Sequence, residues 1–162
     1  MIPRKRIVIL GSTGSIGQSA LRVCAALPDH FEVVGLAALN RADKLIEQAR
    51  VHGVRSVALG DPAAARQAAA RAPDLVMDAG PEGLERLAAR EEADIVLCAL
   101  VGMSGLRPVL AALERGTDVA LATKEVLVAA GERVTALAAR TGARLLPVDS
   151  ERITPPEIAS LS

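Results

Sequence analysis

A short apolar run near the start of the chain leads directly into three evenly spaced glycines. The run Ile7–Leu10 opens the segment IVILGSTGSIG, residues 7–17. The glycines of this segment are Gly11, Gly14 and Gly17. This order predicts a buried strand, a tight turn and the first turn of a helix. A strand that passes so quickly into a helix restricts the chain to the α/β folds more than any other feature does.

The predicted turn has the properties of an anion site. Glycine exposes the backbone N–H groups, because no Cβ holds a ligand away, and the helix start carries a partial positive charge. The hydroxyls of Thr13 and Ser15 suit phosphate contacts. The segment therefore looks like the pyrophosphate cradle of a dinucleotide-binding domain, with the spacing GxxGxxG in place of the more common GxGxxG. A purely structural turn is the alternative.

The rest of the chain alternates apolar runs with helical patterns. Most of the apolar runs are nearly continuous, which is typical of parallel strands covered on both faces. Strands are predicted at residues 6–10, 32–38, 56–59, 75–78, 94–100, 118–122 and 144–148. Helices are predicted at residues 15–27, 42–52, 62–70, 82–90, 106–115 and 125–140. The alternation predicts a doubly wound, Rossmann-like α/β domain, with a mostly parallel sheet of about seven strands and helices on both faces.

Size and composition indicate how many domains the chain forms and which classes of partner it does not favour. The 162 residues are enough for one domain, expected over 1–151, and the Pro155-Pro156 pair indicates an irregular tail at 152–162. Nineteen basic and nineteen acidic residues cancel, so no overall field favours nucleic acid or an anionic membrane. No apolar stretch is long enough for a membrane span.

Cys24 and Cys98 lie in apolar segments and are expected to be buried, reduced thiols of a cytoplasmic protein.

The end of the second predicted strand indicates which nucleotide is bound. In NAD-binding domains an acid usually stands there and holds the ribose hydroxyls. Here the strand is followed by Leu39, Asn40 and Arg41, none of which is acidic. A guanidinium and an amide suit a phosphate monoester, so NADP(H) is favoured over NAD(H). The alternative is that Arg41 is a solvated residue near a helix start.

The sixth predicted strand ends at a second group of candidate residues. Thr123, Lys124 and Glu125 follow it, at the edge where open α/β sheets bind ligands. Lys124 can contact a substrate oxygen or phosphate, and its two neighbours can reach the ribose or amide groups of a cofactor. The alternative is that Thr123 caps the next helix and Glu125 is an acidic first-turn residue.

The seventh predicted strand ends in Asp149, Ser150 and Glu151, at the same edge. Side chains two residues apart in an extended chain project to the same side, so the two carboxylates can share a hard cation such as Mg²⁺ or Mn²⁺. Two carboxylates are an incomplete octahedral site, and substrate or further residues would supply the rest. A solvated acidic turn is the alternative.

Four segments together resemble the amino-terminal NADPH-binding domain of the 1-deoxy-D-xylulose 5-phosphate reductoisomerase family. They are GSTGSIG at 11–17, ALVGMSGL at 99–106, LATKEVLV at 121–128 and LLPVDSE at 145–151. The resemblance extends over about residues 5–151. It implies an enzyme that requires a divalent cation and converts 1-deoxy-D-xylulose 5-phosphate, by isomerisation and reduction with NADPH, to 2-C-methyl-D-erythritol 4-phosphate in non-mevalonate isoprenoid synthesis.

The resemblance implies roles for residues at the matching positions. The residues expected to bind NADPH include the glycines of the turn. They are Gly11, Thr13, Gly14, Ser15, Ile16, Gly17, Leu39, Asn40, Arg41, Thr123 and Glu125. The sugar-phosphate substrate would be contacted by Lys124, Ser150 and Glu151. The metal would be bound by Asp149 and Glu151.

The sequence departs from the family at three places. The family commonly has Gly or Asn at the position of Leu39, and Asn at that of Thr123. After Glu151 the family continues with His and a long catalytic domain, then a helical carboxyl-terminal domain, whereas this sequence has Arg152 and ends at Ser162. We therefore expect NADPH binding with little or no turnover by this chain alone.

Two other functions fit the same residues. A stand-alone NADP(H)-binding or interaction module, from a truncated paralogue, would use the same cofactor site, and an exposed apolar surface would drive formation of a homo-oligomer or docking onto a partner. A dehydrogenase of the homoserine or semialdehyde type also uses GxxGxxG. Short-chain dehydrogenases are excluded, because they require a tyrosine and the chain has none.

Overall fold

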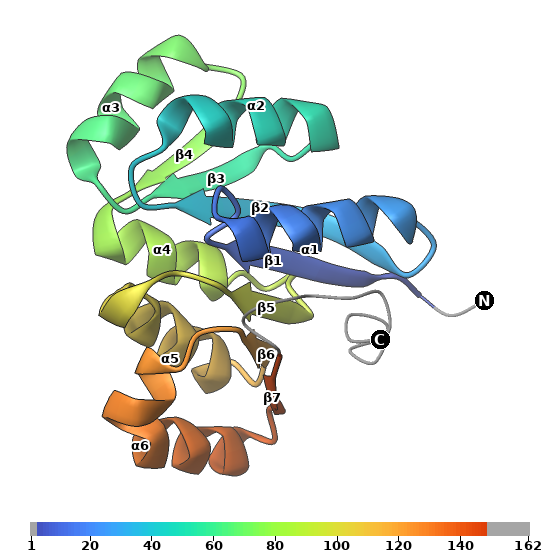
Figure 1. The fold of residues 1–162 in the computed structure, drawn as a ribbon, viewed down its shortest axis with the longest axis vertical. Coiled ribbons are helices and arrows are strands. Elements are labelled where there is room, and N and C mark those ends of the chain that lie inside the picture. The colour runs from blue at the N-terminus through green and yellow to red at the C-terminus, as the bar shows by residue number, and fades with distance from the viewer. Residues whose placement is uncertain (1–2, 149–162) are drawn as a thin grey trace.

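Seven parallel strands form one sheet in the computed structural model, which describes residues 3–148. Their order across the sheet is β4-β3-β2-β1-β5-β6-β7 (Figure 1). The strands are β1 (Lys5–Leu10), β2 (Phe31–Ala38), β3 (Ser56–Leu59), β4 (Val76–Ala79), β5 (Ile95–Cys98), β6 (Asp118–Leu121) and β7 (Leu145–Pro147). The helices are α1 (Ser15–Ala26), α2 (Ala42–His52), α3 (Pro62–Arg71), α4 (Gly80–Ala88), α5 (Leu106–Glu114) and α6 (Glu125–Thr141). The predicted doubly wound fold is confirmed, and each pair of neighbouring strands in this part of the chain is parallel.

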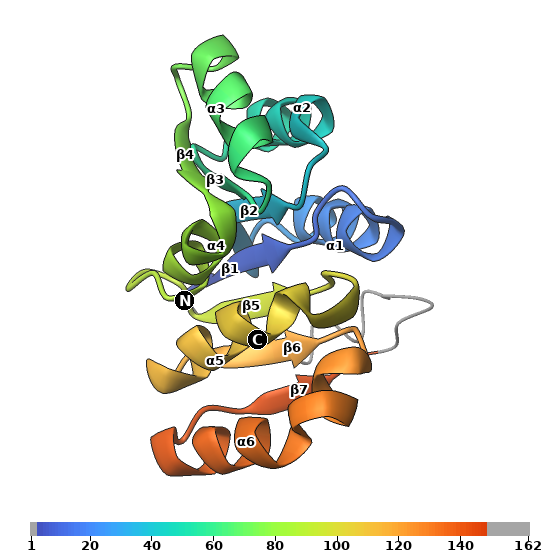
Figure 2. The same ribbon diagram turned by 90° about the vertical axis from the view of Figure 1, so that its left-hand side faces the viewer.

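The helices form a layer on each face of the sheet (Figures 1 and 2). α1, α2 and α3 pack on the face where Ile7 and Ile9 of β1 are fully buried. α4, α5 and α6 pack on the other face, where Val8 and Leu10 are fully buried. Successive side chains of a strand point to opposite faces, so β1 contributes to both cores. This double coverage explains why the strands read as continuous apolar runs.

The direction in which strands are added reverses at β1. From β1 the chain adds β2, β3 and β4 outward on one side. It then returns through α4 on the opposite face, and β5 pairs with the free side of β1. Right-handed crossovers that run in opposite directions place their helices on opposite faces. The carboxyl ends of β1 and β5 therefore mark the switch point at which sheets of this kind bind ligands.

The predicted bounds of these elements lie within two residues of the observed ones. Two local features were not predicted. A single 3₁₀ turn, η1 (Gly102–Gly105), follows β5, and the strand ends at Cys98 where the prediction extended it to residue 100. Helix α6 is kinked at Ala130, whose φ of −143° and ψ of 27° are not helical. Gly131 follows the kink, and its backbone freedom weakens the helix there.

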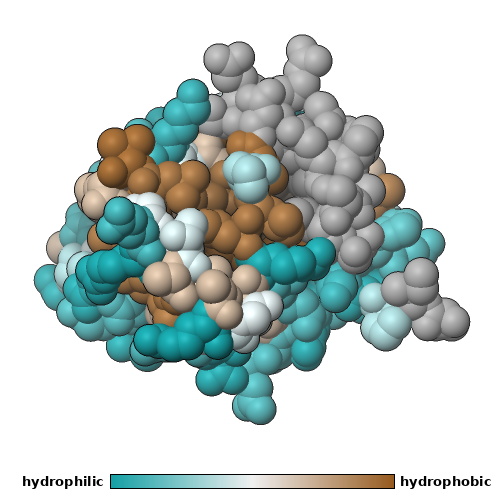
Figure 3. All heavy atoms as spheres, turned by 90° about the horizontal axis from the view of Figure 1, so that it is seen from below, coloured by the Kyte–Doolittle hydropathy of each residue, from teal (hydrophilic) through white to brown (hydrophobic). Residues whose placement is uncertain are grey.

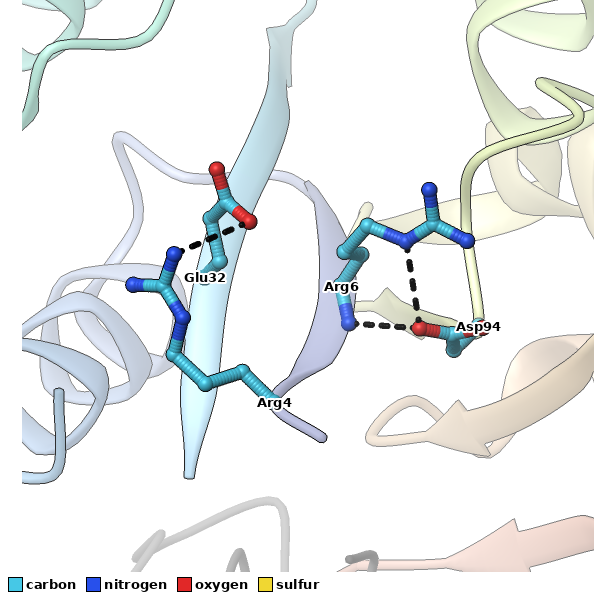
Figure 4. A network of polar contacts seen from close by, with 4 residues as sticks. All are labelled: Arg4, Arg6, Glu32 and Asp94. Atoms are coloured by element: carbon cyan, nitrogen blue, oxygen red, sulfur yellow. Dashed lines mark hydrogen bonds and ion pairs between the residues drawn. The ribbon is translucent and has the colours of Figure 1, made fainter. Parts of the chain in front are cut away.

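Charged side chains join neighbouring strands at the amino-terminal edge of the sheet (Figure 4). The backbone N–H of Arg6 donates to Asp94 Oδ2 at 2.8 Å, and the Nε of Arg6 donates to the same oxygen at 3.4 Å. Arg4 forms an ion pair with Glu32 at 3.4 Å. Asp94 immediately precedes β5, so its carboxylate ties the starts of β1 and β5 together. Glu32 lies in β2, on the other side of β1.

Both cysteines are buried and unpaired, as predicted from their apolar neighbours. Burial raises the pKa of Cys24 to about 12 and that of Cys98 to about 11. Both thiols therefore stay protonated at neutral pH.

Across residues 3–148, the helices are too short or too polar to cross a membrane.

Hydrophobic side chains gather on the surface at the end of the molecule that carries α6 (Figure 3). On α6, Val128 is 86% exposed and Leu127 is also exposed. Val101, between β5 and η1, and Met103, in η1, are exposed as well. Exposed apolar side chains of this kind are the surface that the interaction-module hypothesis requires.

Candidate functional site

A cavity of about 360 Å³ lies at the carboxyl ends of β1, β2 and β5. The turn after β1 lines it with Gly11, Thr13, Gly14, Ser15 and Gln18. The segment at the end of β2 adds Ala38, Leu39, Asn40 and Arg41, and the segment after β5 adds Ala99, Leu100 and Val101. Most of the residues predicted to bind the cofactor therefore come together here. Ile16 and Gly17 do not line the cavity, because Ile16 packs against the core and Gly17 is buried.

Two of the three glycines are required by the packing of the turn itself. Gly11 has a φ of +90°, and a Cβ there would lie 2.6 Å from the carbonyl oxygen of Ala99. A Cβ at Gly17 would overlap the carbonyl oxygen of Gly11. Helix α1 therefore lies directly on the turn, and β5 lies directly beside it. These contacts within the chain account for Gly11 and Gly17 without any ligand.

Gly14 differs from the other two glycines. It is exposed, and a Cβ there would meet only the carbonyl oxygen of Gly11, at an ordinary contact distance of 3.7 Å. The chain itself thus leaves room for a side chain at this position. The small size of Gly14 is explained if another molecule approaches the backbone, which is what a pyrophosphate cradle requires.

Helix α1 begins at this glycine without a side-chain cap. Gly14 is the N-cap residue, no side chain bonds to the first-turn N–H groups, and the first turn contains no acidic residue. Free N–H groups at a helix start, together with the helix dipole, favour an anion. The site therefore offers the donors that the predicted cradle needs.

Two glutamine side chains hold carbonyl groups of the same turn. Gln48 Nε2, from the middle of α2, donates to the carbonyl oxygen of Ser12 at 2.8 Å. Gln18 Nε2, from α1, donates to the carbonyl oxygen of Thr13 at 2.8 Å. Neither contact was predicted. The contact of Gln18 is local, five residues from its acceptor, whereas that of Gln48 joins residues 36 apart in the sequence.

The corner after β2 continues into a second hollow. Asn40 and Arg41 are exposed, and Arg41 is the N-cap residue of α2. The second hollow, of about 420 Å³, is lined by both residues and by Lys44 from the first turn of α2. Within residues 3–148, Arg41 forms no ion pair. Its cationic group is therefore available at the position where the sequence predicted a phosphate monoester.

Leu39 is accommodated by a neighbouring glycine. A Cβ at Gly60 would lie 3.0 Å from Leu39 Cδ2, and the Leu39 side chain packs against the core on the α4 side of the sheet. The interior therefore has room for a leucine at this position, where the family commonly has Gly or Asn.

Thr123 does not cap helix α6, which corrects one of the alternatives considered from the sequence. The N-cap residue is Lys124, and no side chain forms a cap hydrogen bond. The Oγ1 of Thr123 is buried and has no hydrogen-bond partner. The reason is that the helix begins at Glu125, so the N-cap position falls to the residue directly before it. A buried hydroxyl without a partner is uncommon and is explained if a ligand supplies the missing bond.

Lys124 and Glu125 are exposed at the same edge of the sheet. The N–H of Ala122 donates to the Cys98 carbonyl oxygen at 2.9 Å, so the ends of β5 and β6 lie together. Thr123, Lys124 and Glu125 do not line the cavity, but they follow the adjacent strand.

Asp149, Ser150 and Glu151, the predicted metal and substrate residues, lie outside the described residues. Val148, the last residue described, donates its N–H to the Leu121 carbonyl oxygen at 3.1 Å, at the carboxyl end of β6. Among residues 3–148, His, Cys, Asp and Glu form no cluster of three that could hold a metal ion. The metal site therefore stays a prediction.

A family model described as 1-deoxy-D-xylulose 5-phosphate reductoisomerase matches residues 7–131. The chain belongs to this reductoisomerase family. The resemblance deduced from four segments of the sequence is thereby confirmed. A reductoisomerase from Mycobacterium avium is 54% identical over 149 residues, which cover 91% of this chain and 35% of that protein. One from Methylococcus capsulatus is 49% identical over 152 residues, covering 91% and 39%.

Solved structures of reductoisomerases have the same fold as this family member. The enzyme from Zymomonas mobilis in complex with NADPH matches with a TM-score of 0.84 at 33% identity, covering 91% of this chain and 39% of that one. A reductoisomerase in complex with NADPH, fosmidomycin and magnesium matches with a TM-score of 0.86 at 36% identity, covering 91% and 37%. The chain thus spans a little over a third of the length of these relatives.

The likeness to a dehydrogenase of the homoserine type is confined to the fold. A putative homoserine dehydrogenase from Archaeoglobus fulgidus matches with a TM-score of 0.60 at 21% identity, covering 88% of this chain and 42% of that one. At that identity a shared fold carries no information about the reaction.

Two larger hollows on this reductoisomerase-family chain lie away from the strand ends. One, of about 410 Å³, lies between α2 and α3 and is lined by charged residues such as Asp43 and Arg71, which pair with each other. The other, of about 440 Å³, lies between α5 and α6. Neither includes the glycine turn, so size alone does not identify the site.

Proposed function

We propose that this chain forms the NADPH-binding part of a 1-deoxy-D-xylulose 5-phosphate reductoisomerase. The observation that carries the proposal is the turn at Gly14, where the uncapped start of α1 faces a cavity at the β1–β5 switch point. The space at Gly14, which the chain does not fill, fits a diphosphate approaching the backbone. Two family members of known structure are complexes with NADPH, which supports the assignment.

The corner after β2 would distinguish NADPH from NADH. Arg41 would hold the 2′-phosphate, and Lys44, which sequence reasoning missed, would add a second positive charge from the same hollow. None of the three residues that directly follow β2 is acidic, and Asp43, which also lines this hollow, is paired with Arg71. Thr13, Gly14 and Ser15 would contact the pyrophosphate of the same cofactor.

The residues after β6 and β7 would serve the reaction itself. Thr123 and Glu125 would contact NADPH, and the orphaned hydroxyl of Thr123 fits such a bond. Lys124 would contact the sugar-phosphate substrate together with Ser150 and Glu151. The hard oxygen donors of Asp149 and Glu151 suit Mg²⁺ or Mn²⁺, which supplies charge stabilisation at substrate oxygens when bound.

Turnover would require more than these residues. Two carboxylates leave an octahedral ion short of ligands. The matched region also covers only 35% and 39% of the reductoisomerases from Mycobacterium avium and Methylococcus capsulatus. We therefore expect the 162-residue chain alone to bind NADPH and to show little or no conversion of the sugar phosphate. Its buried, unpaired thiols suit a reducing compartment, and we propose the cytoplasm.

Calorimetric titration of the chain with NADPH and with NADH tests the cofactor assignment. NADPH is expected to bind about tenfold more tightly, because a charge-assisted hydrogen bond to the 2′-phosphate is lost with NADH. Arg41→Gln should remove most of that difference, whereas Arg115→Gln, an exposed residue after α5, should not. Equal affinity for both nucleotides would remove the role of Arg41, and absence of binding would overturn the proposed function.

Repeating the titration with Mg²⁺ tests the metal residues. If Asp149 and Glu151 already hold the ion weakly, Mg²⁺ is expected to change the measured NADPH affinity even without substrate. The double variant Asp149→Asn/Glu151→Gln should abolish it. A magnesium effect that survives in the double variant would argue against these two residues.

A further inference from the structure

Two carboxamides from different helices fix consecutive peptide groups of the glycine turn. Gln48 Nε2 donates to the carbonyl oxygen of Ser12, and Gln18 Nε2 donates to that of Thr13, each at 2.8 Å. The Gln48 side chain lies in the interior, with the residue only 9% exposed, and α2 brings it to the turn from a distant part of the sequence. The turn is thus held at two successive carbonyl groups from two sides.

Holding a carbonyl also orients the N–H of the next residue. The described peptide bonds are all trans, and in a trans peptide the C=O and N–H groups point in opposite directions. The contact of Gln48 with the Ser12 carbonyl therefore sets the direction of the Thr13 N–H, for which residues 3–148 provide no acceptor. The contact of Gln18 with the Thr13 carbonyl likewise sets the Gly14 N–H, which makes only a long 3.3 Å bond to the Gly11 carbonyl.

The position of Gln48 is poorly explained by stability alone. Its Oε1 is buried without a hydrogen-bond partner, and so is the Oγ of Ser12 in the turn. Each such unpaired group lowers the free energy of unfolding. An apolar side chain of the same size would avoid burying the unpaired Oε1. The carboxamide provides one thing that an apolar residue does not, which is a donor to the Ser12 carbonyl.

We propose that Gln48 is a positioning residue for the cofactor pyrophosphate. It holds the Ser12–Thr13 peptide so that the Thr13 N–H is directed at the diphosphate before the cofactor arrives, and Gln18 does the same for the next peptide. This inference rests on the proposed NADPH-binding function. The physical benefit is preorganisation, since a donor that is already aligned loses little freedom when the ligand binds.

Gln48→Met tests the proposal, because methionine has a similar length but no donor. NADPH affinity should fall about tenfold, which corresponds to the loss of one aligned hydrogen bond. Adenosine 2′-monophosphate, which has the 2′-phosphate but no pyrophosphate, should bind wild type and variant within about twofold. The thermal midpoint should change little, because the variant removes the unpaired Gln48 Oε1 but leaves the Ser12 carbonyl without its donor. Glu47→Met, the exposed neighbour on α2, is the matched control and should bind both ligands normally.

The outcomes separate this proposal from the proposed function. If the wild type binds NADPH and Gln48→Met binds it equally well, the positioning role is overturned while the cofactor site stands. If both ligands weaken together in the variant, Gln48 is only structural and the proposal fails. If the wild type does not bind NADPH, both conclusions fall.

An NMR titration of the wild-type chain covers the case in which Gln48→Met does not fold. The Thr13 amide proton should shift with NADPH and not with adenosine 2′-monophosphate. A Thr13 amide that is unaffected by NADPH would refute the positioning role directly.

Discussion

The amino-terminal and carboxyl-terminal edges of the sheet both carry polar groups, but they satisfy them differently. At the amino-terminal edge, Arg6 binds Asp94, and Arg144 binds Asp118 with Nη2–Oδ2 and Nε–Oδ2 distances of 2.8 and 2.9 Å. At the opposite edge, within the part of the chain that the structure describes, Arg41 and Lys124 have no ion-pair partner. We call the first the paired edge, because its arginines bind carboxylates, and the second the open edge, because Arg41 and Lys124 there are unpaired among the described residues. Helices that begin at the open edge still pair with each other, as Arg107 of α5 does with Glu82 of α4 at 3.8 Å.

The difference between the two edges follows from the parallel topology of the sheet, and it indicates which edge holds the functional site. Every strand starts at one edge and ends at the other, so the residues before the strands meet each other, as do the residues after them. At the amino-terminal edge the carboxylates also accept backbone N–H groups, Arg6 to Asp94 and Arg144 to Asp118, each at 2.8 Å. Substitutions at that edge should change stability alone. Substitutions at the open edge should change binding.

The largest expected effect is a loss of stability, caused by a substitution at Gly17, where α1 packs against the glycine turn. Gly17→Ala places a Cβ on the carbonyl oxygen of Gly11, so the free energy of unfolding should fall by about 3 kcal/mol. Urea unfolding followed by circular dichroism measures this. Gly131→Ala is the control, because a Cβ there meets no atom within 4 Å, and it should be neutral or stabilising. A loss below about 1 kcal/mol for Gly17→Ala would show that α1 can shift away from the turn.

The next effect separates binding from stability at the open edge. Gly14→Ser should leave the urea midpoint unchanged or slightly higher, because serine is a favourable N-cap residue. NADPH affinity should nevertheless fall more than about tenfold, because the side chain fills the approach to the N–H groups and competes for them. Calorimetry and urea unfolding on the same preparation give both numbers. Normal NADPH affinity would mean that the diphosphate does not lie against Gly14.

The smallest effect is expected at the paired edge. Asp94→Asn should lower the free energy of unfolding by less than about 1 kcal/mol, since the contact with Arg6 is partly exposed and solvent screens it. The affinity for NADPH should not change. Glu91→Gln, an exposed residue in the same loop, is the matched control and should alter neither quantity. A change in NADPH affinity with Asp94→Asn would contradict the separation of the two edges.

The sequence was informative wherever a property is local. The run Ile7–Leu10 and the glycines after it predicted a strand, a turn and a helix, and the structure has all three. The turn at η1 escaped prediction, because the apolar residues after Cys98 continue the strand pattern while the backbone already turns. Thr123 was considered as a helix cap from its residue type, but the cap position depends on where the chain leaves β6.

The candidate site divides in the same way. Gly14, Ser15 and Arg41 could be named from the sequence, because each follows a recognisable strand at a predictable edge. The wall formed by Ala99 and Val101 could not be assigned to the cavity in advance, since that requires knowing that β5 pairs with β1. No residue type or spacing in the sequence marks Gln48 as a partner of the turn.

The amino-acid sequence by itself determined the order of strands and helices, the glycine turn and the absence of an acid after the second strand, because these depend on neighbours along the chain. Only the tertiary structure decided that two of the glycines serve packing and one leaves space, and that Gln48 reaches the Ser12 carbonyl. It also decided that Arg6 and Arg144 find carboxylate partners at one edge of the sheet, while Arg41 and Lys124 find none among residues 3–148 at the other. Those properties arise between segments distant in sequence, whose contacts exist only once the strands have paired and the helices have packed against them.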